Sequence, residues 1–127
     1  MKTPIATSAA PQAIGPYSQA VKAGDWVFVS GQLPLDPAGG AMPATVAEQT
    51  ELCLRNVAAI LGQAGLGLKD VVKTTVFMTD LGQFAAMNEV YAKHFPAPCP
   101  ARATVQVSAL PKGAAVEIEA VALAGTK

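Results

Sequence analysis

Two alternating runs near the C-terminus constrain the fold of this chain more than any other feature. Arg102–Ser108 and Val116–Ala124 alternate apolar with other side chains, which is the period of a β-strand, and a Pro-Lys-Gly turn separates them. We expect two neighbouring strands with one apolar face toward a hydrophobic core. The opposite, polar face then carries Arg102, Thr104, Gln106, Glu117 and Glu119. This polar face is either a solvated surface of the sheet or the floor of a site.

Two amphipathic helices are expected upstream of these runs. Residues Thr45–Gly65 begin with the capping-box sequence TVAE, place apolar side chains at helical spacing and end at a glycine. Residues Asp80–Phe95 begin with a capping aspartate, and Asn88 falls inside the apolar face of this second helix. A buried amide needs hydrogen-bond partners, so Asn88 either ties down a neighbouring strand or loop or faces a site.

Three more runs have β-strand character. Tyr17–Lys22 and Trp26–Ser30 flank an Ala-Gly-Asp turn and predict a β-hairpin, while Val71–Thr79 is rich in β-branched residues. Met1–Gly15 is small and polar and predicts an irregular arm, and Leu33–Pro43 is a loop rich in Pro and Gly. The predicted element order is therefore ββαβαββ.

This order predicts an α+β sandwich that forms a single domain of residues 1–127. Two helices with one apolar face each can cover only one side of the sheet, so the other side must face water or another copy of the protein. Charged residues make up only 14% of the chain, against about 25% in typical soluble domains. Because a small domain has proportionally more surface to cover, we expect a homo-oligomer.

Charge and motif content exclude several classes of function. The net charge is zero and the basic residues are scattered, so the surface typical of nucleic-acid binding is absent and no such partner is expected. No signal peptide and no apolar run of the roughly 20 residues that span a membrane is visible, which predicts a soluble, cytoplasmic protein with no membrane partner. Cys53, Cys99 and His94 match no metal or redox spacing, so we expect no metal site. Cys53, inside a predicted helix, fits a small buried hydrophobe.

Arg102 and Glu117 are the best candidates for chemistry. A guanidinium offers a planar fork that suits a carboxylate, and a glutamate can accept a proton from water or hold the water in place. The alternative is a cross-strand ion pair worth up to about 1 kcal/mol. Tyr17 follows Pro16 at a constrained strand entrance, and Gly31 either lets a ligand approach the end of its strand or simply ends it.

Several separate segments are similar to those of one known family, in the same order. They are AIGPYSQA at Ala13–Ala20, VSGQLP at Val29–Pro34, KTTVFMTDLGQFAAMNEVY at Lys73–Tyr91 and PARATVQVSALPKGAAVEIEA from Pro100. The last run contains Pro-Ala-Arg, an alternating strand, a Leu-Pro turn and an apolar residue followed by Glu. On these motifs, which extend over nearly the whole chain, the sequence resembles the RidA family, also called the YjgF family.

The resemblance implies a chorismate-mutase-like α+β fold and a homotrimer with sites in clefts between subunits. It also implies 2-iminobutanoate/2-iminopropanoate deaminase activity. Such enzymes hydrolyse reactive enamines and imines, for example 2-aminoacrylate and 2-aminocrotonate, to 2-keto acids and ammonia, without a metal or a bound cofactor. Pyridoxal-phosphate-dependent dehydratases acting on serine and threonine release these intermediates.

Site residues are implied by the same resemblance. Arg102 would clamp the substrate carboxylate, Glu117 would orient or activate the attacking water, and Tyr17 would line the cleft from a different subunit than Arg102. The family positions near the substrate are Ser30, Gly31, Asn88 and Thr104. Many deaminase members have Cys where this chain has Thr104, and because the family role there rests largely on the backbone, we expect threonine to preserve it.

Two other classes of function remain open at this stage. The same cleft could bind small carboxylates without turning them over. Members of the family have also been described as ribonucleases, translation inhibitors or chaperones, although the neutral charge of this chain argues against RNA as a partner.

Overall fold

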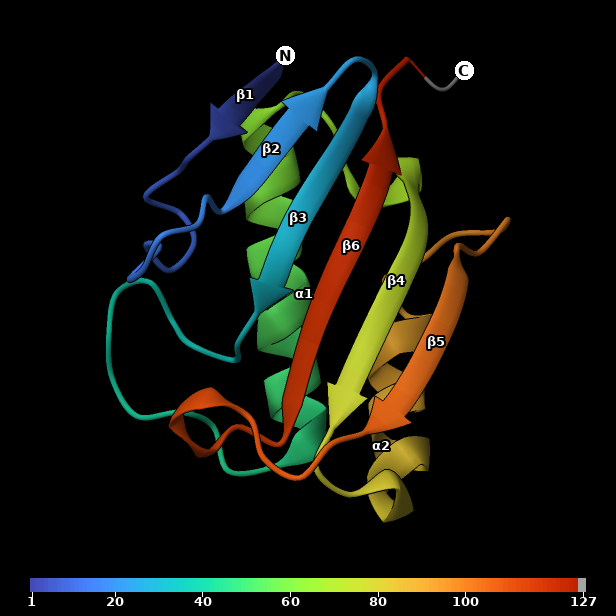
Figure 1. The fold of residues 1–127 in the computed structure, drawn as a ribbon. Coiled ribbons are helices and arrows are strands. Elements are labelled where there is room, and N and C mark those ends of the chain that lie inside the picture. The colour runs from blue at the N-terminus through green and yellow to red at the C-terminus, as the bar shows by residue number, and fades with distance from the viewer. Residues whose placement is uncertain (126–127) are drawn as a thin grey trace.

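Six strands form one sheet within residues 1–125, the part of the chain that the computed structural model describes (Figure 1). In sequence order the strands are β1 (Lys2–Ile5), β2 (Ala20–Ala23), β3 (Trp26–Gln32), β4 (Val71–Met78), β5 (Ala101–Gln106) and β6 (Val116–Leu123). Their order across the sheet is β1-β2-β3-β6-β4-β5, and neighbouring strands are antiparallel except β4 and β5, which are parallel. The helices are α1 (Val46–Gln63) and α2 (Phe84–Ala92).

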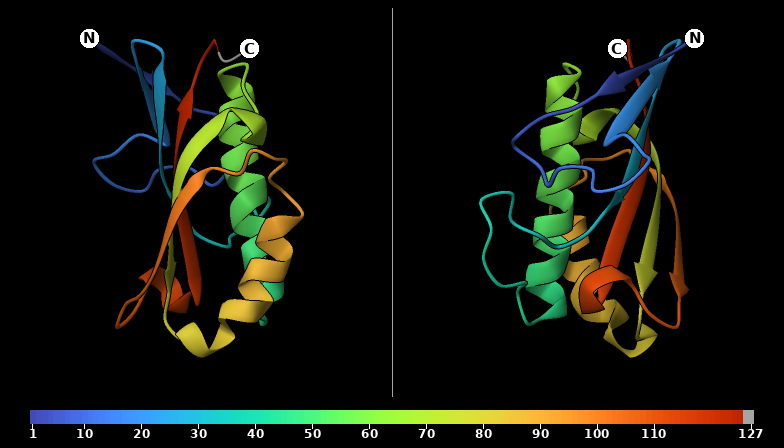
Figure 2. Two further views of the ribbon diagram at one scale, coloured as in Figure 1. Left: turned by 90° about the vertical axis from the view of Figure 1, so that its right-hand side faces the viewer. Right: turned by 60° about the vertical axis from the view of Figure 1, so that its left-hand side comes forward.

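Both helices lie on the same side of the sheet (Figure 2). α1 packs against β3 and β6, and α2 lies beside α1. The buried core between the two layers is apolar and includes Val27, Val29, Leu54, Val57, Ile60, Val76, Met87 and Ile118. The predicted α+β fold with both helices on one face is confirmed.

The first helix begins and ends as its sequence predicts. Thr45 Oγ1 accepts a hydrogen bond from the backbone N–H of Glu48 at 3.1 Å and donates one to the Glu48 carboxylate at 2.9 Å. Gly65 follows the helix with a φ of 76°, a left-handed value that glycine adopts without strain. Cys53 lies on the buried side of this helix, and burial raises the pKa of its thiol, so it packs as the expected small hydrophobe.

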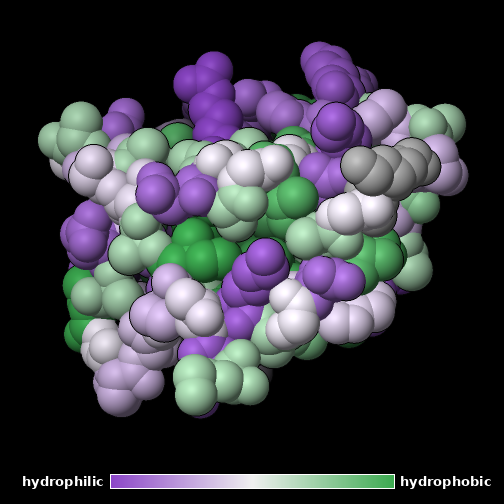
Figure 3. Space-filling model, turned by 90° about the horizontal axis from the view of Figure 1, so that it is seen from above, coloured by the Kyte–Doolittle hydropathy of each residue, from purple (hydrophilic) through white to green (hydrophobic). Residues whose placement is uncertain are grey.

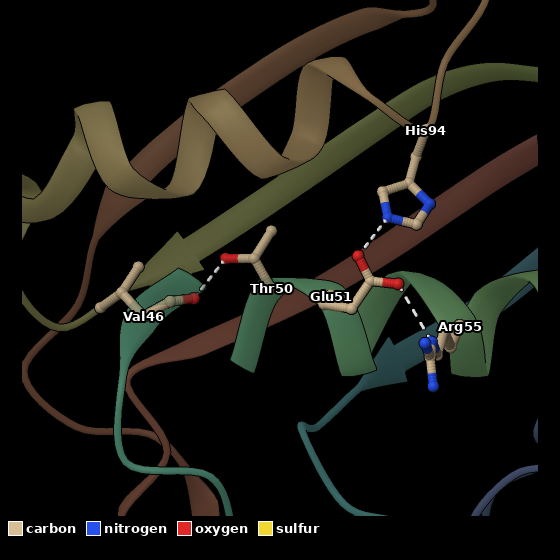
Figure 4. A network of polar contacts seen from close by, with 5 residues as sticks. All are labelled: Val46, Thr50, Glu51, Arg55 and His94. Carbon is tan, nitrogen blue, oxygen red and sulfur yellow. Dashed lines mark hydrogen bonds and ion pairs between the residues drawn. The ribbon is translucent and has the colours of Figure 1, made fainter. Parts of the chain in front are cut away.

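A polar network joins α1 to the chain just beyond α2 (Figure 4). Glu51 accepts hydrogen bonds from Nε2 of His94 at 2.7 Å and from Nε of Arg55 at 3.0 Å. One residue earlier, Thr50 Oγ1 donates to the Val46 carbonyl at 2.8 Å. The hydrogen bond from His94, with a smaller contribution from Arg55, favours the ionised carboxylate and lowers the pKa of Glu51 below its ordinary value.

The N-terminal part of the sheet differs from the sequence prediction. Lys2–Ile5 is a strand rather than part of an irregular arm, and Pro4 is tolerated there because β1 is an edge strand. The predicted strand Tyr17–Lys22 begins only at Ala20, because the Tyr17 N–H turns back to donate to the Gly15 carbonyl at 2.8 Å. The observed order is therefore βββαβαββ, with one strand more than predicted.

The second helix is shorter than predicted. The Asp80 carboxylate accepts a hydrogen bond from the Gly82 N–H at 2.8 Å, but this cap opens a short 3₁₀ turn, Leu81–Gln83, and not an α-helix. α2 starts at Phe84 and ends at Ala92, ahead of the prolines that follow.

The sheet face opposite the helices exposes large apolar side chains. Trp26, Phe28 and Val105 are 44%, 45% and 40% exposed, and Phe28 pairs in register with Val121. Seen from the end that carries both termini, hydrophilic side chains crowd one edge of the molecule, and hydrophobic residues are exposed among the remaining side chains (Figure 3). A sheet face with large exposed apolar side chains is typical of contact with another protein surface. The homo-oligomer therefore stays a prediction, for which this face is a structural reason. Neither helix of the described chain has the length and hydropathy needed to cross a membrane.

Candidate functional site

Arg102 and Glu117 lie on opposite faces of the sheet. On β4, Thr74 pairs in register with Arg102, and Phe77 pairs with Glu117. Residues three apart along a strand point to opposite faces. Arg102 therefore points toward the helix layer. Glu117 points to the sheet face opposite the helices, which we call the open face. The prediction that these two residues share one polar face is wrong.

The strands that carry the two residues are not neighbours either, because β4 lies between β5 and β6. β4, α2 and β5 form a parallel βαβ unit, in which the helical crossover brings β5 to one edge of β4. β6 takes the other edge and pairs with β3 as well, which buries its apolar side chains in the middle of the sheet. The predicted neighbouring strands and the alternative of an Arg102–Glu117 ion pair are therefore both wrong for a single chain.

The polar groups near Glu117 line a cleft of about 660 Å³. Besides Glu117, its lining includes Tyr17, Ser30, Gly31, Lys112 and Glu119. We call this space the Glu117 cleft. It brings together four of the residues that the sequence predicts for the site, namely Tyr17, Ser30, Gly31 and Glu117.

Gly31 provides the space that the Glu117 side chain occupies. A Cβ at this position would collide with Oε2 of Glu117 and would lie 3.0 Å from its Cδ and 3.2 Å from its Cγ. The ladder between β3 and β6 also shifts register between Val29 and Gln32, so the strand is irregular where the carboxylate packs against it. Gly31 is thus a close-approach glycine and not a plain strand terminator, because β3 continues past it.

The Glu117 carboxylate is poised to act as a base. Burial raises its pKa above the ordinary value, and repulsion from Glu119 adds to the shift. Among the hydrogen bonds and ion pairs of residues 1–125, none involves this carboxylate. A carboxylate with a raised pKa and free lone pairs can hold a water molecule and accept its proton.

Tyr17 and Ser30 lie at the cleft but make different contacts. Tyr17 is 51% exposed, and its hydroxyl accepts only a long hydrogen bond of 3.4 Å from the Ile14 N–H within the described chain. Ser30 Oγ donates to the Ser18 carbonyl at 2.6 Å, so its proton is used inside the chain and only its acceptor capacity remains for a ligand.

Lys112 is a cleft residue that the sequence analysis missed. Its φ of 59° and ψ of 20° make it the only non-glycine residue with positive φ in the described chain. Such a conformation costs of order 1–3 kcal/mol and persists where the surroundings demand it. Lys112 lines both the Glu117 cleft and a neighbouring cleft of about 330 Å³. Its place before Gly113 in the Pro-Lys-Gly turn was the available signal.

Arg102 is held by three side chains of α2. Its Nη1 donates to Oδ1 of Asn88 at 2.7 Å, and its guanidinium carbon lies 4.7 Å from the centre of the Tyr91 ring and 5.4 Å from that of Phe84. Tyr91 in turn shares a hydrogen bond of 2.7 Å with Thr74. We call these side chains the Arg102 cluster. They fix one end of the guanidinium and leave its other donors for a ligand.

The contact with Arg102 explains why an amide lies on the apolar side of α2. Asn88 ties β5 to the helix, as one of its two predicted roles requires, and through Arg102 it also belongs to the candidate site. The chain thus contains two partial sites, the Glu117 cleft and the Arg102 cluster. A reaction that uses both needs the Arg102 cluster of one copy to meet the Glu117 cleft of another.

Comparison with known proteins identifies the family. A family model described as Endoribonuclease L-PSP matches residues 7–124. RidA from the Antarctic bacterium Psychrobacter sp. PAMC 21119 superposes with a TM-score of 0.92 at 48% sequence identity, covering 95% of this chain and 98% of that one. The chain belongs to the RidA family.

Other RidA family relatives are similar over nearly the same length. RutC family protein y4sK of Sinorhizobium fredii is 59% identical, covering 95% of this chain and 97% of the relative. The 2-iminobutanoate/2-iminopropanoate deaminase of Bos taurus is 49% identical, covering 95% and 89%. The crystal structure of Escherichia coli TdcF with bound serine has a TM-score of 0.90 at 50% identity, covering 95% and 98%.

Thr104 carries an unpaired polar atom. Its Oγ1 is buried and has no hydrogen-bond partner among the described residues. Thr104 shares a strand face with Arg102, since the two are two residues apart on β5. A buried hydroxyl without a partner costs about 1–3 kcal/mol.

No metal centre accompanies this RidA family site within residues 1–125, where no group of three or more His, Cys, Asp or Glu residues could hold an ion. Of the two cysteines, Cys53 is buried and Cys99 is exposed, and neither lines the Glu117 cleft.

Two buried amides on α1 hold neighbouring loops, and the sequence analysis missed both; of the two, only Asn56 bonds to a residue, Leu33, that lines the Glu117 cleft. Nδ2 of Asn56 donates to the carbonyls of Leu33 and Leu35 at 3.1 and 2.9 Å. Gln49 donates to the Pro43 carbonyl at 2.9 Å and accepts from the Ala115 N–H at 2.8 Å. The two amides are seven residues apart, which is two helical turns, so their place on the apolar side was readable from the sequence.

Proposed function

We propose that this RidA family member hydrolyses reactive enamines and imines, such as 2-aminoacrylate and 2-aminocrotonate, to 2-keto acids and ammonia. The observation that carries the proposal is the state of Glu117. Its carboxylate has a raised pKa, packs against Gly31 beside Tyr17 and has no hydrogen-bond partner in the described chain. The activity named for the bovine relative and the serine bound to E. coli TdcF support a small substrate derived from an amino acid.

The reaction needs one water molecule and a positioned base. After the enamine has taken up a proton at carbon, the imine carbon is electrophilic. Water held by Glu117 forms a new C–O bond to this carbon, the C=N electron pair moves to nitrogen, and Glu117 accepts the proton of the water. Glu117 then returns this proton to the nitrogen, the C–N bond breaks as the hydroxyl oxygen forms the C=O bond, and the hydroxyl proton leaves with ammonia as ammonium. Orientation of the two reactants supplies most of the acceleration.

Arg102 would supply that orientation by binding the substrate carboxylate. Its guanidinium carries donors in a fork, and Asn88 and the flanking rings of Phe84 and Tyr91 restrain it. The remaining groups have minor roles in the proposal: Tyr17 lines the cleft, Thr104 lies beside Arg102 on the same strand face, and Ser30 and Gly31 shape the strand end.

The proposal includes a homotrimer whose sites lie between subunits. Two observations support it. Arg102 and Glu117 point to opposite faces of one sheet, so a second copy is needed to bring them together. The open face also exposes Trp26, Phe28 and Val105, which a neighbouring copy would cover.

A coupled assay tests the proposed activity. A serine dehydratase generates 2-aminoacrylate, and pyruvate release is followed with and without the protein. We expect acceleration by the wild type, a loss of about 100-fold or more in Arg102→Ala, because two charge-assisted hydrogen bonds are removed, and no loss in Arg55→Ala at the chain's other arginine. No acceleration by the wild type, or full activity in Arg102→Ala, would refute the proposal.

The same protein can be assayed for the two other classes of function. Binding of 2-ketobutyrate without turnover of any imine would favour a carboxylate-binding module. Cleavage of RNA at physiological salt would favour the activity in the family model's description, against which the net charge of zero argues.

A further inference from the structure

The side chain of Tyr17 does not hold in place the segment on which Tyr17 lies. Residues 6–19 contain no helix or strand, and we call them the 6–19 segment. Among the hydrogen bonds of residues 1–125, Tyr17 takes part only in the turn between its N–H and the Gly15 carbonyl and in the 3.4 Å contact from the Ile14 N–H, and half of it is exposed. Its place at the Glu117 cleft must therefore come from whatever fixes the backbone of the 6–19 segment.

The amide of Gln19 fixes that backbone from inside. Gln19 is only 3% exposed. Its Oε1 accepts from the Thr7 N–H at 2.7 Å, and its Nε2 lies within donating distance of the carbonyls of Thr7 at 3.1 Å, Ala10 at 3.3 Å and Pro11 at 2.7 Å. Every polar atom of this amide is thus used to gather one stretch of chain, Thr7–Pro11.

The other end of Gln19 is anchored at the strand that packs against Glu117. The Gln19 carbonyl accepts from the Ser30 N–H at 2.9 Å, and Ser30 Oγ donates to the carbonyl of Ser18 at 2.6 Å. The next residue, Gly31, is the one against which Glu117 packs. Gln19 therefore connects the 6–19 segment on one side of the cleft to the Gly31–Glu117 contact on the other.

We propose that Gln19 is the positioning residue of the Glu117 cleft, which sets the place of Tyr17 relative to Glu117 by holding the 6–19 segment. This inference rests on the proposed function for its kinetic consequence, but the restraint on the segment is independent of any activity. Gln19 touches no reacting atom in this account, and it acts only through Tyr17.

Two substitutions remove the restraint in different ways. Gln19→Leu keeps a similar volume but loses every hydrogen bond of the amide. Gln19→Glu keeps an acceptor for the Thr7 N–H. It places a second carboxylate oxygen where Nε2 lies in the wild type, and the carbonyl oxygens of Thr7 and Pro11 repel that oxygen. If a misplacement of about 1 Å costs up to 100-fold in rate, we expect both variants to lose roughly 10- to 100-fold in kcat/KM. Gln19→Asn, which keeps the amide on a shorter stem, should recover part of the loss.

A double-mutant cycle separates positioning from a general loss of stability. If Gln19 acts through Tyr17, adding Gln19→Leu to Tyr17→Ala should cause little further loss of kcat/KM. The control is Gln49→Leu, because Gln49 is a similarly buried amide whose partners, Pro43 and Ala115, do not line the Glu117 cleft. Its effect on kcat/KM should be the same factor with or without Tyr17→Ala. A full multiplicative loss for Gln19→Leu in the Tyr17→Ala background would overturn the inference.

Hydrogen exchange gives the readout that does not depend on activity. We expect faster exchange across the 6–19 segment in Gln19→Leu and unchanged exchange there in Gln49→Leu, measured at a temperature where both variants are folded. Unchanged exchange of this segment in Gln19→Leu would overturn the inference. A wild-type protein without deaminase activity would refute the proposed function alone, and the exchange result would still decide whether Gln19 holds the segment.

Discussion

Gly31→Ala should separate activity from stability in this protein. The added Cβ would lie 3.0 Å from Cδ and 3.2 Å from Cγ of Glu117 and would collide with its Oε2. Ordinary contact between carbon atoms begins at about 3.5–4.0 Å. The Glu117 carboxylate must therefore move by roughly 0.5–1 Å, and a displacement of this size in a catalytic base costs about 10- to 100-fold in rate.

The same substitution should leave the fold intact. The backbone at Gly31 is not in the left-handed region, so alanine adopts it without strain. Glycine inside a strand is less stable than alanine by roughly 0.5–1 kcal/mol, which offsets part of the cost of moving Glu117. We expect a melting temperature within a few degrees of the wild type together with the loss of kcat/KM in the dehydratase-coupled assay.

Gly62→Ala is the matched control. Gly62 lies in α1, and a Cβ there would meet nothing within 4 Å. This variant should keep full activity and gain about 0.5–1 kcal/mol of stability from the better helix propensity of alanine. Wild-type activity in a folded Gly31→Ala would show that the Glu117 position does not matter, and the reasoning about the cleft would fail.

Three further predictions follow from the polar groups. Because burial raises the pKa of Glu117, ionising this carboxylate costs stability as the pH rises from the ordinary pKa of 4.5 through the raised pKa. Glu117→Gln should therefore melt higher than the wild type at pH 7 and lose this advantage below pH 4.5. The same variant should lose deaminase activity. Because the hydrogen bond from His94 lowers the pKa of Glu51, the ionised form stabilises the fold above the ordinary pKa of 4.5, and this stabilisation is lost as the pH falls through the lowered pKa. Urea unfolding of Glu51→Gln should therefore give a lower free energy of unfolding than the wild type at neutral pH, and the difference should vanish in acid. A difference that stays constant with pH would contradict this. Removing the hydrogen bond to Arg102 in Asn88→Ala should raise KM about tenfold or more with a smaller change in kcat, and steady-state kinetics that show an unchanged KM would refute the role of Asn88.

Features encoded locally were predictable from the sequence. The start of α1 follows from the reciprocal hydrogen bonds of Thr45 and Glu48, and its end from a glycine at positive φ. The position of both helices on one side of the sheet was also predictable, since two helices with one apolar face each can cover only one face. These results depend on neighbours within a few residues or on simple geometry.

Features that depend on partners far along the chain were not predictable. The alternation of residues 101–106 is real, but a period of two cannot tell which face meets α2, so Arg102 was assigned to the wrong side. Strands that follow one another in sequence usually pair, so β5 and β6 were expected to be neighbours. The βαβ crossover instead places β4 between them. Tyr17 has strand propensity, and the hydrogen bonds of Gln19 and Ser30 hold its segment outside the sheet.

Mixing two inactive variants tests the central claim most directly, which is that Arg102 of one copy and Glu117 of another form one site. Arg102→Ala and Glu117→Gln are each purified, dissociated and reassembled together, with exchange verified by mass, and deaminase activity is measured against each variant reassembled alone. Random assembly pairs an intact Arg102 with an intact Glu117 at about a quarter of the interfaces, so activity should recover to roughly that fraction of the wild type. Verified exchange without any recovery would contradict a site shared between copies.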